Sequence, residues 1–258
     1  MSDLVIRQDV KPGLIRLTLN RPDAFNALSE DMLAAIRTAL EAIARDESVK
    51  VVILAAAGKA FCAGHDLKEM RAAPSQDYYE GLFKQCTDVM MGILRLPQPV
   101  IAQVEGVATA AGCQLVAMCD LAVSADSARF AVSGVNLGLF CSTPSVALSR
   151  NIGRKEALYM LLTGEFISAE QAQQWGLVNE VAPHAEVAQA TEALAEKILK
   201  KPDPALRLGK RLFYEQVETN IERAYELAGQ TMACNMMDET ALEGVQAFID
   251  KRAPNWST

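Results

Sequence analysis

The chain alternates between short apolar runs and stretches with helical periodicity. In Leu14–Leu19 every second side chain is apolar, which predicts a strand with one buried face. Three runs are almost continuously apolar, as is typical of strands buried on both sides: Val49–Ala55, Val100–Val104 and Leu121–Ser124. Small residues dominate Val107–Met118, which predicts a helix beside these strands.

Two longer segments between the strands predict amphipathic helices. Ser29 has the side chain of an N-cap, and the apolar residues that follow it share one face: Met32, Ile36, Leu40 and Ile43. Tyr79–Leu94 repeats the pattern, with Leu82, Phe83, Cys86, Met90 and Ile93 pointing inward. Alternating strands and helices indicate an α/β fold.

From about residue 143 the pattern predicts helices only. Ser168 with Gln171 forms a capping pattern, and Gly176 ends that helix. Further helical pieces are predicted at residues 194–198, 206–217, 221–232 and 241–248. We therefore divide the chain into a core at residues 1–195 and a helical region at residues 196–258. The apolar positions of this region fit packing on the core and packing on another subunit equally well.

The composition excludes several classes of protein. The formal net charge of −7 argues against a nucleic-acid partner, which normally requires a basic face. The six cysteines form no CxxC pair and only two histidines accompany them, so we expect no metal site. Gln114 and Asp120 interrupt the most apolar stretch, which favours a buried segment over a membrane span. Free thiols and an N-terminus without a signal pattern predict a cytoplasmic protein.

Two segments carry the candidate chemistry. Ala60–Met70 follows a buried strand and ends in a predicted helix, and Val104–Leu115 passes from a strand through small residues into another helix. Backbone N–H groups at such strand-to-helix turns face a crevice, and small side chains let a ligand approach them closely. Together the two segments could present a pair of N–H donors to a developing oxyanion.

Several motifs, in this order, resemble the crotonase (enoyl-CoA hydratase/isomerase) superfamily over essentially the whole chain. They are Arg21-Pro22-x-x-x-Asn26-Ala27-Leu28, Phe61-Cys62-Ala63-Gly64-His65-Asp66-Leu67-Lys68-Glu69-Met70, Pro99-Val100-Ile101-Ala102, Gly112-Cys113, Cys119-Asp120-Leu121 and Leu161-Leu162-Thr163-Gly164-x-x-Ile167-Ser168-Ala169. The resemblance implies an α/β fold built as a spiral of ββα units, with a helical C-terminal trimerisation region. It also implies a homotrimer or a hexamer.

The same resemblance implies a coenzyme A thioester as substrate, no required cofactor and a place in fatty acid metabolism. The thioester oxygen is expected between the backbone N–H groups of His65 and Ala111. Coenzyme A is expected beside Ala24, Phe25, Ala63, Asp66 and Leu67, with Lys68 and Lys251 as phosphate partners and Lys59 and Arg71 as further candidates. The acyl group is expected beside Gly64, Gly134 and Val135.

The chain departs from this pattern at both acid–base positions. Hydratases of the superfamily use two glutamates, and here the matching residues are Gln114 and Gly134. An amide can orient a water molecule but cannot take its proton, and glycine has no side chain. We therefore expect hydration to be slow or altered.

Two other residues are candidates for the missing chemistry. Similar decarboxylases carry a histidine at the position of His65 and a tyrosine at that of Cys141. The alternatives to a slow hydratase are thus a decarboxylase or thioesterase, and a non-catalytic acyl-CoA-binding regulator. We expect Glu105 and Asp120 to have structural roles and His184 to lie on the surface.

Overall fold

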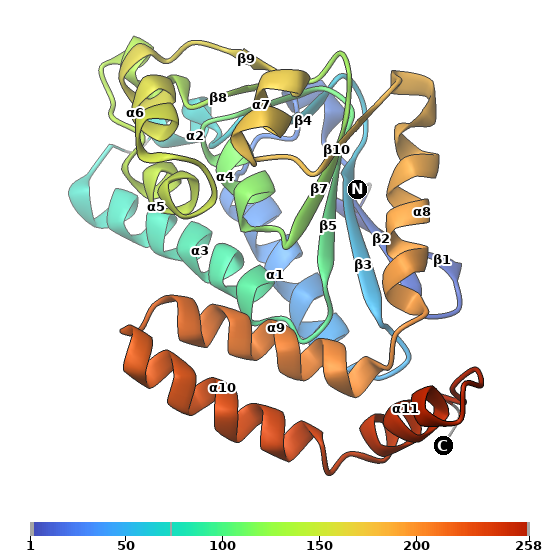
Figure 1. The fold of residues 1–258 in the computed structure, drawn as a ribbon. Helices are drawn as coiled ribbons and strands as arrows, with labels where there is room; N and C mark the ends of the chain where they lie inside the picture. The colour runs from blue at the N-terminus through green and yellow to red at the C-terminus, as the bar shows by residue number, and fades with distance from the viewer. Residues whose placement is uncertain (1–2, 73, 257–258) are drawn as a thin grey trace.

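Two β-sheets form the centre of the molecule and helices surround them (Figure 1). The computed structural model describes residues 3–72 and 74–256. The larger sheet contains, in spatial order, β1 (Val5–Lys11), β2 (Leu14–Leu19), β3 (Val51–Ala56), β5 (Val100–Val104), β7 (Leu121–Ala125) and β10 (Glu180–Ala182). Only β1 runs antiparallel to its neighbour. The predicted strands are confirmed, because their apolar runs are buried as expected.

The smaller sheet gives the fold its spiral form. It contains β4 (Ala60–Cys62), β6 (Val107–Thr109), β8 (Arg129–Ala131) and β9 (Ile167–Ser168), of which only the β8–β9 pair is antiparallel. The pairs β3–β4, β5–β6 and β7–β8 each place one strand in the larger sheet and the next in the smaller one. This is the ββα spiral that the resemblance implies, and the predicted α/β class is confirmed.

Helices fill the connections. They are α1 (Glu30–Ala44), α2 (Leu67–Ala72), α3 (Gln76–Arg95), α4 (Ala111–Met118), α5 (Ser142–Asn151), α6 (Arg154–Thr163), α7 (Ala169–Trp175), α8 (Val187–Leu199), α9 (Asp203–Val217), α10 (Ile221–Asn235) and α11 (Glu239–Ile249). Three short 3₁₀ turns complete the described chain: η1 (Pro22–Ala24), η2 (Ser133–Leu137) and η3 (His184–Glu186).

The helix starts predicted from capping residues are confirmed. The hydroxyl of Ser29 accepts a hydrogen bond from the Met32 N–H at 3.2 Å, and Ser168 does the same for Gln171 at 3.2 Å. Gly176, with a φ of 92°, ends α7 in the left-handed conformation that glycine adopts most easily. These contacts are local in sequence, which is why residue type alone could predict them.

Two predictions about secondary structure are wrong. The helix expected from Val107 begins at Ala111, because the first three residues form β6 in the smaller sheet. The region after residue 143 is not purely helical, since β9 and β10 lie within it. Strands of two or three residues are too short to show a periodicity of their own, so only their sheet partners define them.

The last helices are attached to the core largely through polar contacts. On α9 the only buried residue is Lys210, whose ammonium donates to Asp120 at 2.6 Å and to the carbonyls of Ile93 and Gln98 at 3.0 Å each. Tyr214 donates to the same carboxylate at 2.9 Å. This network confirms the structural role expected of Asp120.

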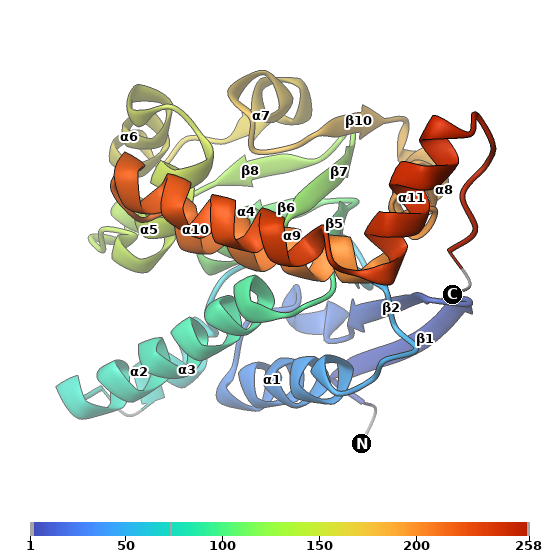
Figure 2. The same cartoon turned by 60° about the horizontal axis from the view of Figure 1, so that its bottom comes forward.

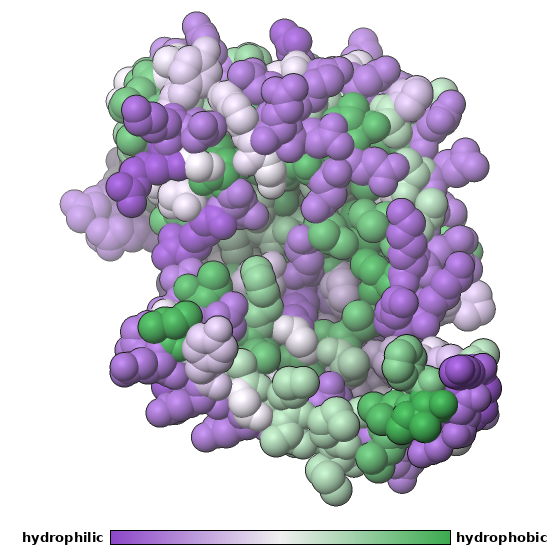
Figure 3. Space-filling model, in the orientation of Figure 1, coloured by the Kyte–Doolittle hydropathy of each residue, from purple (hydrophilic) through white to green (hydrophobic). Residues whose placement is uncertain are grey.

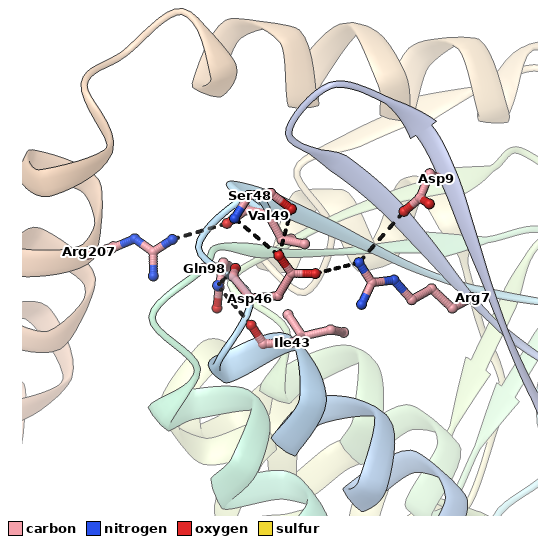
Figure 4. Close-up of polar contacts among 8 residues, drawn as sticks. All are labelled: Arg7, Asp9, Ile43, Asp46, Ser48, Val49, Gln98 and Arg207. Atoms are coloured by element: carbon pink, nitrogen blue, oxygen red, sulfur yellow. Dashed lines mark hydrogen bonds and ion pairs between the residues drawn. The ribbon is translucent and has the colours of Figure 1, made fainter.

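The same helix also contacts the turn between α1 and β3. Figure 4 shows Arg207 of α9 donating to the carbonyl of Val49 at 3.0 Å. In the same turn Asp46 accepts from Arg7 at 2.6 Å and from the backbone N–H of Ser48 at 3.1 Å. The α9 helix is therefore fixed to the end of the larger sheet at which β3, β5 and β7 begin.

Beyond α9 the chain extends along one side of the body. In Figure 2 the helices α9 and α10 lie side by side, and α11 follows at their end. The predicted boundary between residues 195 and 196 falls inside α8, and the elements after it are helices. Figure 3 shows apolar residues gathered on α11. Large apolar side chains are exposed from α10 to α11, including Ile221, Tyr225, Met237 and Phe248. Within residues 3–72 and 74–256, none of the helices combines the length and apolar character needed to cross a bilayer.

Candidate functional site

A cavity of about 240 Å³ lies between the start of α2, the start of α4 and the segment from Ser133 to Pro144. Six residues singled out from the sequence line it: Ala63, His65, Leu67, Ala111, Gly134 and Cys141. They come from three different turns of the spiral, so the fold brings together positions up to 78 residues apart in the chain, from Ala63 to Cys141.

Glycines allow the first two segments to approach each other. A methyl carbon on Gly64 would lie 2.9 Å from the Ala110 Cβ atom and 3.4 Å from the Ala111 nitrogen. One on Gly112 would lie 2.1 Å from the carbonyl oxygen of Cys62, far inside contact distance. Only glycine fits at these positions, and the residues that follow each strand therefore meet at one point.

The N–H groups of His65 and Ala111 are not used by the surrounding backbone. The segment of Leu28 pairs with His65 as a parallel bridge, with bonds from Leu28 to Gly64 at 2.8 Å and from Asp66 to Leu28 at 3.3 Å. In such a bridge the N–H of His65 itself points to the opposite side. Ala111 is the first residue of α4, where N–H groups have no partner within the helix. Among the described residues, neither group donates a backbone hydrogen bond outside helices and strands.

The backbone strain at this point falls on the neighbour of Ala111. Ala110 has a φ of 51° and a ψ of −122°, a conformation that residues with a Cβ atom rarely adopt. Ala111 is not among the residues with positive φ. Its N–H is therefore held in a helical geometry, as expected if the alanine is to replace a glycine there.

The side chain of His65 is largely enclosed by apolar groups. Its ring packs edge-on against Phe83 with 5.4 Å between ring centres, and Nε2 is buried without a hydrogen-bond partner in the described chain. Burial lowers the pKa of His65 to about 4, so the imidazole is neutral at pH 7. The low pKa makes the ring a weak proton acceptor, but its unpartnered nitrogen can take part in a hydrogen bond to a ligand that reaches it.

Neither predicted acid–base position carries an acid. Gln114 is 5% exposed, and its Oε1 atom has no partner among the described residues. It lies one turn beyond Ala110 and Ala111 on the same face of α4, but it is not among the residues that line the cavity.

Gly134 has no space for a side chain. A Cβ atom there would lie 2.5 Å from the carbonyl oxygen of Leu139 and 2.7 Å from the sulfur of Cys141. The Gly134 N–H donates to that sulfur at 3.3 Å. Burial raises the pKa of the Cys141 thiol, and the bond from Gly134 offsets this only in part. The sulfur thus occupies the space into which a residue at position 134 would project.

The residues expected around coenzyme A are divided between two places. Ala24 ends η1 and Phe25 follows it, 55% exposed and adjacent to Ala63, whose N–H donates to the Phe25 carbonyl at 3.0 Å. Leu67 at the cavity edge is also 55% exposed, and Lys68 next to it is exposed. Lys251 lies beyond α11, which Figures 1 and 2 both show on the side of the molecule away from α2.

Two further site predictions concern residues outside the cavity lining. Val135 points its side chain toward Gly164, where a Cβ atom would lie 2.9 Å from Val135 Cγ1. The carboxylate of Asp66 accepts from Arg21 at 2.8 Å and from the N–H groups of Lys68 and Glu69. Burial raises the pKa of Asp66, but the hydrogen bonds from Arg21, Glu69 and Lys68, together with the charge of Arg21, outweigh it and lower that pKa below its usual value.

The sequence did not single out several apolar residues that line the cavity. They are Met70, Phe83, Leu137, Leu139, Phe140 and Pro144. Phe83 was expected to face the core, since it shares the apolar face of α3, but it is partly exposed and contacts His65 instead. Helical periodicity identifies a buried face and cannot distinguish a core from a cavity wall. The exposed position of His184, by contrast, is as predicted.

Comparisons with known proteins place this chain in a family. The chain is 46% identical over 245 residues to the rat protein named enoyl-CoA hydratase domain-containing protein 3, mitochondrial; this covers 95% of the chain and 82% of the rat protein. A crystal structure of enoyl-CoA hydratase from Mycobacterium smegmatis is 64% identical, with a TM-score of 0.97 and 99% of each chain covered. The structure of human enoyl Coenzyme A hydratase domain-containing protein 3 is 44% identical, with a TM-score of 0.94 and coverage of 98% and 100%.

These names contradict the cytoplasmic location predicted from the sequence. The rat relative is named mitochondrial, as are its mouse and human counterparts. Free cysteines separate reducing compartments from oxidising ones, but they do not distinguish one reducing compartment from another. Thiol content was therefore the wrong guide to location.

A family model for enoyl-CoA hydratase/isomerase matches residues 9–258, nearly the entire chain. The match agrees with the spiral of ββα units and with the order of the motifs read from the sequence. The chain belongs to the enoyl-CoA hydratase/isomerase family, and with it to the crotonase superfamily.

Proposed function

We propose that this protein is an acyl-CoA enzyme that binds the thioester oxygen between the backbone N–H groups of His65 and Ala111. The observation that carries the proposal is that both residues line one cavity and that neither N–H is used by the surrounding backbone of the described chain. A pair of fixed N–H dipoles stabilises the negative charge that the oxygen gains when the thioester reacts at its α or β carbon. Removing one such donor typically costs about 100- to 1000-fold in rate.

Coenzyme A lies, in this proposal, along Ala24, Phe25, Ala63, Asp66 and Leu67, and no further cofactor is required. The exposed side chains of Phe25 and Leu67 support this, because they offer apolar surface at the cavity edge. Lys68 is exposed close by and is the proposed phosphate partner within the same chain. The acyl group extends past Gly64 and Gly134, with Val135 holding the backbone of η2.

Lys251 contributes to phosphate binding only if the chain assembles. It is remote from Lys68 within one chain, so in the proposal it reaches coenzyme A on another copy in a homotrimer or hexamer. The exposed apolar residues of α10 and α11 support such an assembly, since a large apolar surface is usually covered. Size-exclusion chromatography with light scattering measures the mass of the assembly directly. A monomer would rule out the proposed role of Lys251.

Hydration is proposed to be slow. Gln114 cannot remove a proton from water, and Gly134 offers no acid in place of a glutamate. The close contact at Gly134 supports this, because the sulfur of Cys141 already fills the adjacent space.

A decarboxylase is the second candidate, and the state of His65 favours it over a thioesterase. Its neutral ring lines the cavity and has an unpartnered nitrogen, so it can hydrogen-bond to the acyl group without either glutamate. Burial raises the pKa of Cys141, which disfavours the thiolate that a covalent thioesterase would need. A non-catalytic acyl-CoA-binding regulator predicts tight binding without any product.

The test follows crotonyl-CoA through the loss of its conjugated thioester absorbance. We expect slow turnover by the wild type and at least tenfold faster hydration by Gln114→Glu, since a general base contributes about 100- to 10,000-fold where it is well placed. Gln8→Glu, which adds the same charge on the exposed edge strand β1, is the control and should change nothing. Hydration by the wild type at a rate normal for hydratases would refute the proposed slowness. Failure to bind any acyl-CoA would refute the whole proposal.

A further inference from the structure

The carboxylate of Asp66, the residue after His65, joins two segments of the site. Its Oδ1 atom accepts hydrogen bonds from the N–H groups of Lys68 at 3.0 Å and Glu69 at 3.3 Å, at the start of α2. Its Oδ2 atom accepts from the Arg21 guanidinium at 2.8 Å, and the Asp66 side chain is only 14% exposed. One side chain therefore fixes both the residue after His65 and the helix beyond it.

Arg21 is itself held in a fixed place. Its backbone N–H donates to the side-chain oxygen of Asn26 at 2.8 Å, and the Asn26 amide donates to the carbonyls of Ala57 and Ala60 at 2.8 Å each. Asn26 is fully buried and has a φ of 53°, a conformation that asparagine tolerates better than most residues. The backbone of Arg21 is thus anchored, through Asn26, to the loop between β3 and β4, and its guanidinium also donates to the Ala27 carbonyl at 3.4 Å.

We propose that the Arg21–Asp66 ion pair positions the His65 N–H in line with that of Ala111. The inference rests on the proposed function above, because it assigns a role to this pair in polarising the thioester. The segment containing His65 has backbone hydrogen bonds on its Leu28 side only, and the opposite side faces the cavity. Apart from the ion pair, the hydrogen bonds of the described chain on that side after Gly64 run from the Asp66 N–H to the Leu28 carbonyl at 3.3 Å and from the Glu30 N–H to the Glu69 carboxylate at 3.0 Å, and neither one holds the Asp66 side chain.

Small displacements of the donor have large effects. Groups that stabilise a developing charge must lie within about 0.5 Å of their productive place, and an error of about 1 Å costs on the order of 100-fold. Gly64 adds freedom next to the donor, since it has a φ of 90° and no side chain. The ion pair supplies the restraint that the glycine lacks.

The experiment uses the full chain and 4-(dimethylamino)cinnamoyl-CoA, a chromophoric thioester. Its absorption moves to longer wavelength when the carbonyl oxygen accepts hydrogen bonds, so the shift reports polarisation without any turnover. Asp66→Asn removes the charge but keeps an oxygen that can cap α2. Arg21→Met removes the other partner and leaves both capping bonds intact.

Asp46→Asn is the matched control. Asp46 also accepts from an arginine, Arg7, and from a backbone N–H, that of Ser48, but in the turn between α1 and β3 shown in Figure 4. We expect Asp66→Asn and Arg21→Met to lose at least half of the shift at saturating protein, and Asp46→Asn to retain it.

The possible outcomes separate this inference from the proposed function. A full shift in both site variants, each folded by circular dichroism, overturns the positioning role while leaving the two donors in place. No shift in the wild type overturns the donor pair itself, and the positioning role with it. If Asp66→Asn does not fold, the result for Arg21→Met decides alone, because Asp66 still caps α2 in that variant.

Discussion

Acidification should destabilise this protein through His65. The ring is largely buried against Phe83 and has no partner for Nε2 in the described chain, and burial lowers its pKa from 6.5 to about 4. Unfolding exposes the ring and restores its ordinary pKa. Between these two values the unfolded chain binds a proton that the folded chain does not.

The sign and size of the change in the free energy of unfolding follow from proton linkage. Stability rises with pH wherever the unfolded state binds more protons, so the contribution is complete above pH 6.5 and is lost as the pH falls toward 4. The difference of 6.5 minus about 4 is about 2.5 pH units, and each unit corresponds to 1.36 kcal/mol. Between pH 7 and pH 4, His65 therefore removes about 3 kcal/mol from the free energy of unfolding.

The assay is urea unfolding of the wild type and His65→Gln across this pH range. The variant keeps the backbone N–H, but its side chain cannot titrate. The difference between the free energies of unfolding of the two proteins should therefore change by about 3 kcal/mol from pH 7 to pH 4. His184→Gln removes the exposed histidine and should retain the acid dependence, because His65 is intact. Parallel curves for the wild type and His65→Gln would show that burial does not suppress protonation of this ring.

Three substitutions test other contacts by urea unfolding. Gly134→Ala should lower the free energy of unfolding by about 1–3 kcal/mol, since its Cβ would lie 2.5 Å from the Leu139 carbonyl oxygen; unchanged stability would mean that the loop moves freely. Ala110→Gly should raise it by about 1 kcal/mol, because strain of about 1–3 kcal/mol outweighs the entropy that glycine adds to the unfolded chain; a loss would show that the methyl group matters more. Lys210→Ala should lower it by about 3–5 kcal/mol by leaving Asp120 without its buried partner, and a loss below about 1 kcal/mol would contradict this.

Much of the fold could be predicted because its causes are local. Buried strands such as Val100–Val104 are continuously apolar, and the helices after Ser29 and Ser168 begin with a side chain that caps them. The family, too, followed from residue types in a fixed order, and the comparisons confirm it. The short strands β9 and β10 were missed because their stability comes from their neighbours in the sheet.

The candidate site is a different case. Ala63, His65, Ala111 and Gly134 were named from the sequence, and the structure places them around one cavity. Their surroundings were not predictable, because Phe83 and Leu139 reach the cavity from elements with ordinary patterns. Val135 and Lys251 carry the same kind of sequence signal as the others, yet they do not line the cavity in a single chain.

The sequence by itself determined which of the long strands are buried and where the capped helices begin, and it predicted that Gln114 and Gly134 stand at the two acid–base positions. Each depends on the chemistry of one residue or on a repeat within one segment. Only the tertiary structure decided that His65 and Ala111 line one cavity, that the sulfur of Cys141 fills the space beside Gly134, and that Lys210 pairs with Asp120. Such contacts join residues far apart in the chain, and their distances follow from how the spiral closes rather than from any pattern along it.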